Sequence, residues 1–158
     1  IALARQKAND SIHHRKSRMI NTFNWPVRVY YEDTDAGGIV FYANYLKFFE
    51  RARTEWLRDI GINQNSMKDE YNAVFVVKAT AVEYHASARL DDELRVTVVV
   101  EKTGRASIVF SQEVWCDERR LTSAKVTICC VNMAQWRSMP IPEPVLKLIN
   151  PALFTKLD

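Results

Sequence analysis

The chain has 158 residues, a formal net charge of +3 at pH 7, and a composition that is 47% hydrophobic and 26% charged. This length predicts one globular domain with a real core, and so small a charge argues against nucleic-acid binding. No apolar run approaches the length of a membrane-spanning helix, and the three cysteines have neither metal-site nor disulfide spacing. We therefore expect a cytoplasmic protein with reduced thiols.

The first 20 residues are basic and polar, without the apolar core of a secretory signal. We predict that residues 1–20 form a poorly structured extension and that residues 21–158 form the domain. Met19 suggests that the native start lies at that position.

The domain is expected to open with a strand over residues 27–31, followed by the charged, glycine-bearing turn EDTDAGG. One long helix is then predicted over about residues 42–60, because apolar residues recur there at steps of three and four. Gly61 suits the end of that helix. The apolar face is made by Phe41, Tyr45, Phe48, Phe49, Ala52, Trp56, Leu57 and Ile60.

After the helix we predict a polar connecting loop over residues 62–73 and then a series of strands. The expected strands span residues 74–86, 95–102, 107–116 and 121–134, and a short terminal helix spans 143–149. Short turns join the last three strands, so they form an antiparallel meander. The fold class is therefore α+β, with one long helix packed on a five-stranded antiparallel sheet. The open edge of such a sheet predicts self-association.

The turn before the helix contains residues that are suited to acyl-transfer chemistry. Asp33 and Asp35 precede Gly37 and Gly38, and the amides at a helix start favour negative charge. A carboxylate facing such amides can attack an acyl carbon or activate water, while an amide binds the oxygen that becomes negative. Asp35 is the candidate catalytic residue, and the alternative is that it caps the helix. Gly38 is expected to let the backbone approach a ligand closely.

These residues resemble the active-site signature of the 4-hydroxybenzoyl-CoA thioesterase family. The matching positions are Arg28-Val29, Thr34-Asp35, Gly38-Ile39-Val40, Ala43 and Tyr45. The longer segments FNWPVRVYYEDTDAGG and FFERARTEWLR resemble the Tol–Pal-associated acyl-CoA thioesterase branch of that family, and the likeness continues to about residue 135. The resemblance implies the hotdog fold, in which subunits form dimers and often tetramers with active sites at the subunit interface.

The resemblance also implies roles for individual residues. Asp35 would be the catalytic carboxylate, as nucleophile or general base, and the backbone N–H of Tyr42 would polarise the thioester carbonyl. Many members of the Tol–Pal branch have histidine at the position of Tyr42, so this chain departs from them there. Tyr31 matches a tyrosine that lines the site, and the alternative is a strand residue that faces the core. Lys102 and Arg105 would bind the CoA phosphates, unless they are merely solubilising cations.

Together these features predict an acyl-CoA thioesterase that releases a free acid and coenzyme A, without metal or cofactor, since coenzyme A is part of the substrate. Acyl carrier protein is a further candidate partner, and the assembly is a homodimer or homotetramer. The sequence does not distinguish an aliphatic from an aromatic acyl group in the substrate. A non-catalytic module that binds acyl-CoA or acyl carrier protein is one alternative. A hydratase is another, but it requires a positioned histidine with an acid, and we expect no histidine near Asp35, while His85 is expected to be a surface or structural residue.

Overall fold

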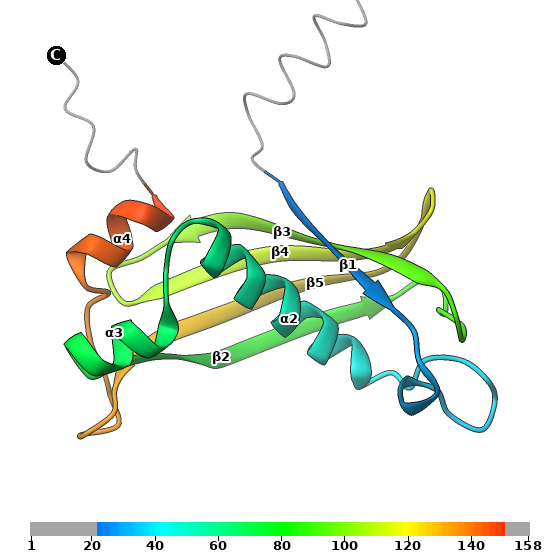
Figure 1. Ribbon diagram of the computed structural model, residues 1–158, viewed down its shortest axis with the longest axis horizontal. Helices are drawn as coiled ribbons and strands as arrows, with labels where there is room; N and C mark the ends of the chain where they lie inside the picture. The colour runs from blue at the N-terminus through cyan, green and yellow to red at the C-terminus, as the bar shows by residue number, and fades with distance from the viewer. Residues whose placement is uncertain (1–21, 151–158) are drawn as a thin grey trace, which may run out of the picture.

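A curled antiparallel sheet wraps around one long helix in the computed structural model, which describes residues 22–150 (Figure 1). The expectation about residues 1–20 lies outside the described residues. Among the residues described, no helix is both long and apolar enough to span a membrane. The elements are β1 Phe23–Arg28, a 3₁₀ turn Tyr31–Asp33, α2 Asn44–Asp59, α3 Gln64–Tyr71, β2 Ala73–Tyr84, β3 Glu93–Thr103, β4 Ser107–Cys116, β5 Arg119–Asn132, β6 Arg137–Ser138 and α4 Glu143–Ile149.

The strands follow the order β1-β3-β4-β5-β2, and the short β6 pairs with β5. All pairs are antiparallel, and β3, β4 and β5 form the expected meander. Among the described residues β1 pairs only with β3, and β2 pairs only with β5. Both therefore form edges of the sheet, and five consecutive residues of β2, from Val77 to Ala81, are exposed.

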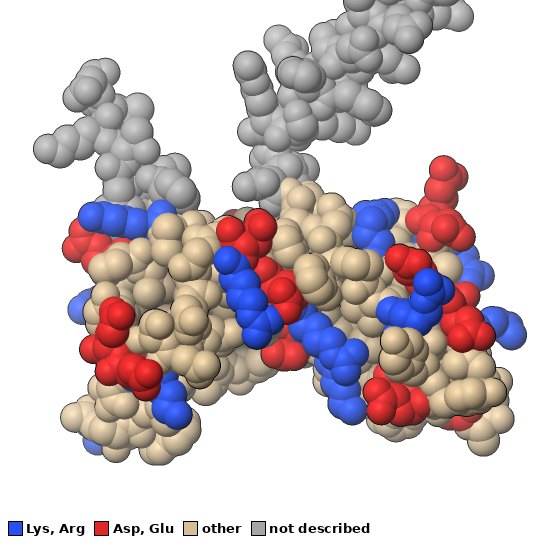
Figure 2. All heavy atoms as spheres, in the orientation of Figure 1, with Lys and Arg blue, Asp and Glu red and all other residues tan. Residues whose placement is uncertain are grey.

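Helix α2 lies across the concave face of the sheet and is roughly 24 Å long at 1.5 Å per residue (Figure 1). Its apolar stripe is buried as predicted, and the Trp56 ring packs edge-on against Phe110 at a centroid distance of 5.4 Å. Phe41 was expected on this stripe but is 45% exposed, because the helix begins three residues later. Figure 2 shows basic and acidic side chains interspersed over the outward side of α2.

The predicted loop over residues 62–73 was wrong, because a second helix, α3, occupies it. The Asn63 side chain caps this helix by accepting a hydrogen bond from the Ser66 N–H at 3.0 Å, and Asn72 ends it in the left-handed conformation. Met67 is the one buried residue of α3, so the segment has almost no apolar periodicity to reveal it. With α2 and the expected terminal helix α4, the described residues hold three α-helices, one more than predicted.

The first strand also differs from the prediction. It covers Phe23–Arg28 instead of residues 27–31, and the chain turns into a 3₁₀ helix at Tyr31. Pro26 is accommodated because β1 is an edge strand, where one side of the backbone needs no ladder hydrogen bond. The apolar run that predicted a strand therefore continues past the point where pairing with β3 ends.

A buried polar network ties α2 to the sheet. The Arg53 guanidinium donates to Gln112 Oε1 at 2.9 Å, and Gln112 Nε2 donates to the carbonyls of Phe49 and Thr97 at 3.2 Å each. Arg53 is 8% exposed and Gln112 is fully buried. Burial lowers the pKa of Arg53, and Glu50 partly opposes that shift. No carboxylate among the described residues forms an ion pair with Arg53.

Candidate active site

The turn between β1 and α2 is held in place by the connection between β2 and β3. Thr34 and Val40 form one isolated bridge across the turn, and Ile39 and Arg89 form a second bridge to the connection. The Val40 N–H also donates to the Ala88 carbonyl at 2.9 Å. The two contacts with the connection, at Arg89 and Ala88, fix the turn beside the end of β2, although they join residues about fifty positions apart in sequence.

The two aspartates of this turn have different environments. Asp33 is 5% exposed, its Oδ2 accepts from the Tyr30 N–H at 2.9 Å, and its carbonyl accepts from Phe41 N and Asn44 Nδ2. Asp35 is exposed, and its Oδ1 accepts from the Gly37 N–H at 2.8 Å. Its Oδ2 accepts no hydrogen bond from the described residues. Asp33 is therefore structural, whereas Asp35 offers a free carboxylate oxygen.

Asp35 is not the cap of α2. The residue at the N-cap position is Ala43, whose backbone is already helical and whose side chain cannot accept a hydrogen bond. Within residues 22–150 the N–H groups of Tyr42 and Ala43 donate no hydrogen bond. The start of α2 thus presents unpaired donors, which favour an oxygen that carries negative charge.

A pocket of about 380 Å³ joins the free carboxylate to the helix start. It is lined by Asp35, Ile39, Val40, Phe41, Tyr42, Tyr45, Tyr84, His85, Ala86 and Ser87. Asp35 and Tyr42 were predicted site residues, and the structure brings them to one pocket. Tyr84, which no sequence pattern singled out, lies at the end of β2 with its ring edge-on to the rings of Tyr42 and Tyr45.

His85 also lines this pocket, so a histidine does lie near Asp35 in space although none is near it in sequence. Its Nε2 lies 3.0 Å from Ser123 Oγ on β5. This contact is compatible with the expected structural or surface role of His85, which stays a prediction.

Gly37 and Gly38 differ in why glycine is required. Gly38 has a φ of +76°, a conformation that L side chains rarely adopt, and no described atom lies within 4 Å of where its Cβ would be. A Cβ on Gly37 would lie 3.1 Å from Asp35 Oδ1, the oxygen that the Gly37 N–H binds. Gly38 therefore supplies the turn, and its close approach to a ligand stays a prediction, whereas Gly37 is the glycine at which a Cβ would crowd the Asp35 carboxylate.

Replacing Gly38 by alanine is expected to lower the free energy of unfolding by about 1–2 kcal/mol, because the left-handed conformation strains a residue with a Cβ. Urea denaturation measures this loss. Gly37→Ala is the matched control and should cost less, since Gly37 does not have a positive φ. Equal losses in the two variants would contradict this assignment.

Tyr31 does not line the Asp35 pocket of its own chain. It lies in the 3₁₀ turn with 82% of its surface exposed, beside a separate hollow lined by Tyr30, Glu32, Leu90 and Asp91. The alternative placement, a strand residue facing the core, is wrong because β1 ends at Arg28. A site role for Tyr31 therefore stays a prediction.

Lys102 and Arg105 are exposed at the turn between β3 and β4. β3 runs from the neighbourhood of the Asp35 turn to the other end of the sheet (Figure 1). At about 3.3 Å per residue the strand separates Lys102 from that turn by roughly 30 Å. One chain therefore does not bring these cations to the Asp35 pocket.

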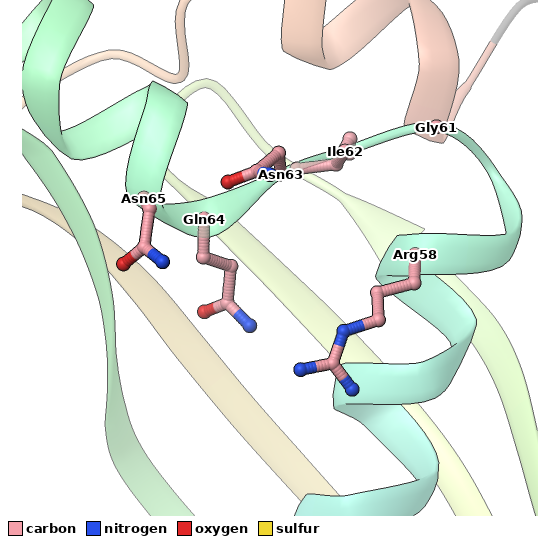
Figure 3. Close-up of a pocket in the computed structure, with 6 residues that line it drawn as sticks. All are labelled: Arg58, Gly61, Ile62, Asn63, Gln64 and Asn65. Carbon is pink, nitrogen blue, oxygen red and sulfur yellow. The ribbon is translucent and has the colours of Figure 1, made fainter.

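A larger hollow of about 560 Å³ lies at the far end of α2 (Figure 3). It is lined by Arg58, Gly61, Ile62, Asn63, Gln64 and Asn65. Arg58 is paired with Glu55, and the Asn63 side chain caps α3. Its lining offers amides and a guanidinium but no carboxylate, thiol or imidazole, so the smaller pocket is the better catalytic candidate. Among the described residues no three His, Cys, Asp or Glu side chains gather as a metal site.

Comparison with known proteins agrees with this geometry. The profile of the Thioesterase superfamily matches residues 37–123, more than half of the chain. The chain belongs to the thioesterase superfamily. Acyl-CoA thioesterase YbgC of Haemophilus influenzae is 44% identical over 125 residues, which are 79% of this chain and 92% of that protein. Acyl-CoA thioester hydrolase YbgC of Escherichia coli O157:H7 is 42% identical, over 78% of this chain and 92% of that protein.

A solved structure extends this result to the fold. The crystal structure of a probable thioesterase from Bartonella henselae matches with a TM-score of 0.74 and 30% identity, over 77% of this chain and all of that one. The expected hotdog fold is thus confirmed, and the protein is a thioester hydrolase of the YbgC-like branch of the thioesterase superfamily. The motif residues that suggested the superfamily, from Thr34 to Tyr45, are those that form the pocket and the turn beside it.

Proposed function

We propose that this thioesterase hydrolyses acyl-CoA, with Asp35 as its catalytic carboxylate. The observation that supports the proposal is one pocket lined both by Asp35, whose carboxylate has an unbound oxygen, and by Tyr42, whose N–H is unpaired before the start of α2 among the described residues. The YbgC relatives, which are named as acyl-CoA thioesterases, support coenzyme A as the thiol portion of the substrate.

Two routes follow from this arrangement. As general base, Asp35 takes a proton from water, and the water oxygen attacks the thioester carbon. As nucleophile, Asp35 attacks the carbon itself, and water then cleaves the resulting anhydride. In both routes the carbonyl oxygen becomes negative and is bound by the N–H of Tyr42. The C–S bond then breaks, coenzyme A leaves as a thiolate and takes up a proton, and the acid is released.

The tyrosine side chain at position 42 does not affect this use of its backbone amide. Because a phenol is a poor base near neutral pH, we propose that no histidine-assisted proton transfer operates at this position. Asp35 is then the one side chain to which we assign proton transfer.

We further propose that the enzyme functions as a homodimer or a homotetramer of such dimers. The exposed run of β2, from Val77 to Ala81, leaves a strand edge without a partner among the described residues. A second copy can extend the sheet across this edge. Such an arrangement also accounts for Lys102 and Arg105, because the far end of one sheet can then approach the Asp35 pocket of the neighbouring copy.

The variant Lys102→Ala/Arg105→Ala is expected to raise KM for acyl-CoA about tenfold with kcat unchanged, because the phosphates are bound equally in ground and transition states. Steady-state thiol release measures both constants. The control substrate is an N-acetylcysteamine thioester, which lacks the nucleotide and should keep its KM. A rise in KM with both substrates, or with neither, would refute phosphate binding by these cations.

Mixed dimers test whether the site is shared between copies. One chain carries Asp35→Asn and the other carries Lys102→Ala/Arg105→Ala. A shared site predicts that each mixed dimer keeps one complete site and about half of the wild-type kcat/KM. Failure to recover beyond the average of the two parent dimers would contradict sharing.

The proposal extends to the cellular setting through the resemblance to the Tol–Pal-associated branch. We propose a cytoplasmic enzyme of envelope or phospholipid metabolism that also accepts acyl groups from acyl carrier protein. Hydrolysis of acyl-CoA and the matching acyl carrier protein thioester, compared at equal concentration, tests the second carrier.

The reaction itself is tested by thiol release from short, long and aromatic acyl-CoAs. Turnover of any of them supports the enzyme, and the preferred acyl group defines its substrate class. Binding of all acyl-CoAs without turnover would refute the proposal. It would favour the alternative, a non-catalytic module that binds acyl-CoA or acyl carrier protein.

A further inference from the structure

The phenol of Tyr84 links the end of β2 to the start of α2. Its O–H donates to the Tyr42 carbonyl at 2.9 Å, across 42 positions of sequence. The Tyr84 ring lies edge-on to Tyr42 at 6.2 Å and to Tyr45 at 5.7 Å between centroids. Burial raises the pKa of Tyr84, and the neighbouring Tyr42 phenol adds to that shift. The Tyr84 phenol therefore keeps the proton that it donates.

This hydrogen bond acts on the peptide group between Tyr42 and Ala43. The Tyr42 carbonyl and the Ala43 N–H belong to one planar amide, so fixing the oxygen fixes the direction of the N–H. A donor on the carbonyl also polarises the amide and strengthens its N–H as a donor. That N–H and the N–H of Tyr42 are both unpaired among the described residues, and Tyr42 lines the pocket.

Few other contacts hold this peptide. The N-cap residue Ala43 offers no side-chain hydrogen bond, although its carbonyl accepts from the Leu46 N–H at 3.2 Å. The other nearby restraints come from Asn44, whose N–H donates to the Phe41 carbonyl and whose side chain donates to the Asp33 carbonyl. The Tyr84 phenol donates its hydrogen bond to the Tyr42 carbonyl itself. Loss of that bond would leave the peptide free to tilt without unfolding the helix.

We propose that Tyr84 is a positioning residue, which holds the Tyr42–Ala43 peptide so that the N–H groups of Tyr42 and Ala43 together bind the thioester oxygen in the transition state. The inference rests on the proposed hydrolysis of acyl-CoA. It adds a second donor, the Ala43 amide, and a residue from β2 that controls it.

The test is Tyr84→Phe, which removes the O–H and keeps the ring contacts with Tyr42 and Tyr45. We expect kcat to fall about tenfold with KM changed by less than about twofold, because a transition-state donor is misaligned rather than removed. The amide proton of Ala43 should also move upfield in a ¹H–¹⁵N spectrum, since its peptide loses polarisation. Tyr71→Phe, at an exposed tyrosine on α3, is the matched control and should alter neither kcat nor the Ala43 signal.

An unchanged kcat in Tyr84→Phe, with wild-type turnover intact, would overturn the positioning role and leave the proposed function standing. A raised KM with unchanged kcat would also overturn it, because Tyr84 would then contact the substrate directly. If the wild-type chain turns over no acyl-CoA, the proposed function fails and the positioning role fails with it. The Ala43 signal separates a real loss of the bond from an inactive preparation.

Discussion

Replacing Asp35 by asparagine is expected to lower kcat for acyl-CoA hydrolysis at least ~10²-fold, a loss of ~2.7 kcal/mol of transition-state stabilisation. An amide can neither attack the thioester nor take a proton from water. It still has an oxygen to accept the Gly37 N–H, which Asp35 Oδ1 accepts at 2.8 Å, so the turn should keep its shape. Thiol release at saturating substrate measures the loss, and circular dichroism and size-exclusion chromatography check the fold and assembly.

Asp33→Asn is the matched control for this experiment. Asp33 is two residues away on the same turn, but it is buried and its carboxylate accepts from the Tyr30 N–H. Its substitution should keep most of kcat and act mainly on stability. Equal losses of activity at the two positions, or near-wild-type kcat in Asp35→Asn, would rule out the assignment of Asp35.

Gln112→Leu is expected to destabilise the protein by about 3 kcal/mol, the largest effect that we expect on folding. Gln112 accepts from the Arg53 guanidinium and donates to the carbonyls of Phe49 and Thr97, all inside the core. Leucine has a similar volume, so the cost comes from the unpaired polar groups rather than from a cavity. The free energy of unfolding from urea denaturation measures it.

The double variant Arg53→Met/Gln112→Leu isolates the cause. Removing both partners leaves no buried charge unpaired, so the double variant should lose less stability than the sum of the two single variants. Lys47→Met, at an exposed position on α2, should change stability by less than about 0.5 kcal/mol. A loss below about 1 kcal/mol in Gln112→Leu would show that the network is dispensable.

Periodicity predicted the elements that pack their apolar side chains against one core. The strand over residues 107–116 and the helix over 143–149 have the predicted bounds, and α2 begins and ends within two residues of its prediction. Helix α3 was not predicted, because Met67 is its one buried residue and leaves no apolar periodicity. The bounds of β1 were predicted wrongly, because the end of this strand is set by its pairing with β3. Elements defined by tertiary contacts leave little trace in local sequence.

The same distinction applies to the site. The motif singled out Asp35 and Tyr42, which share the pocket. Sequence spacing does not separate Asp33 from Asp35, because the burial of Asp33 depends on backbone groups on both sides of the turn. No sequence pattern indicated Tyr84, since an aromatic residue at a strand end is ordinary packing until its hydrogen bond to the Tyr42 carbonyl, just before α2, is seen.

The length of β3 has a consequence for gene dosage. Because the strand keeps Lys102 and Arg105 roughly 30 Å from the Asp35 of the same chain, a lone copy would have a carboxylate without the phosphate anchor that we propose. If neighbouring copies complete one another, output per chain rises with expression level over the range in which copies associate. An allele defective at Asp35 would then be partly complemented by one defective at the cations, whereas two alleles defective at the same end would not.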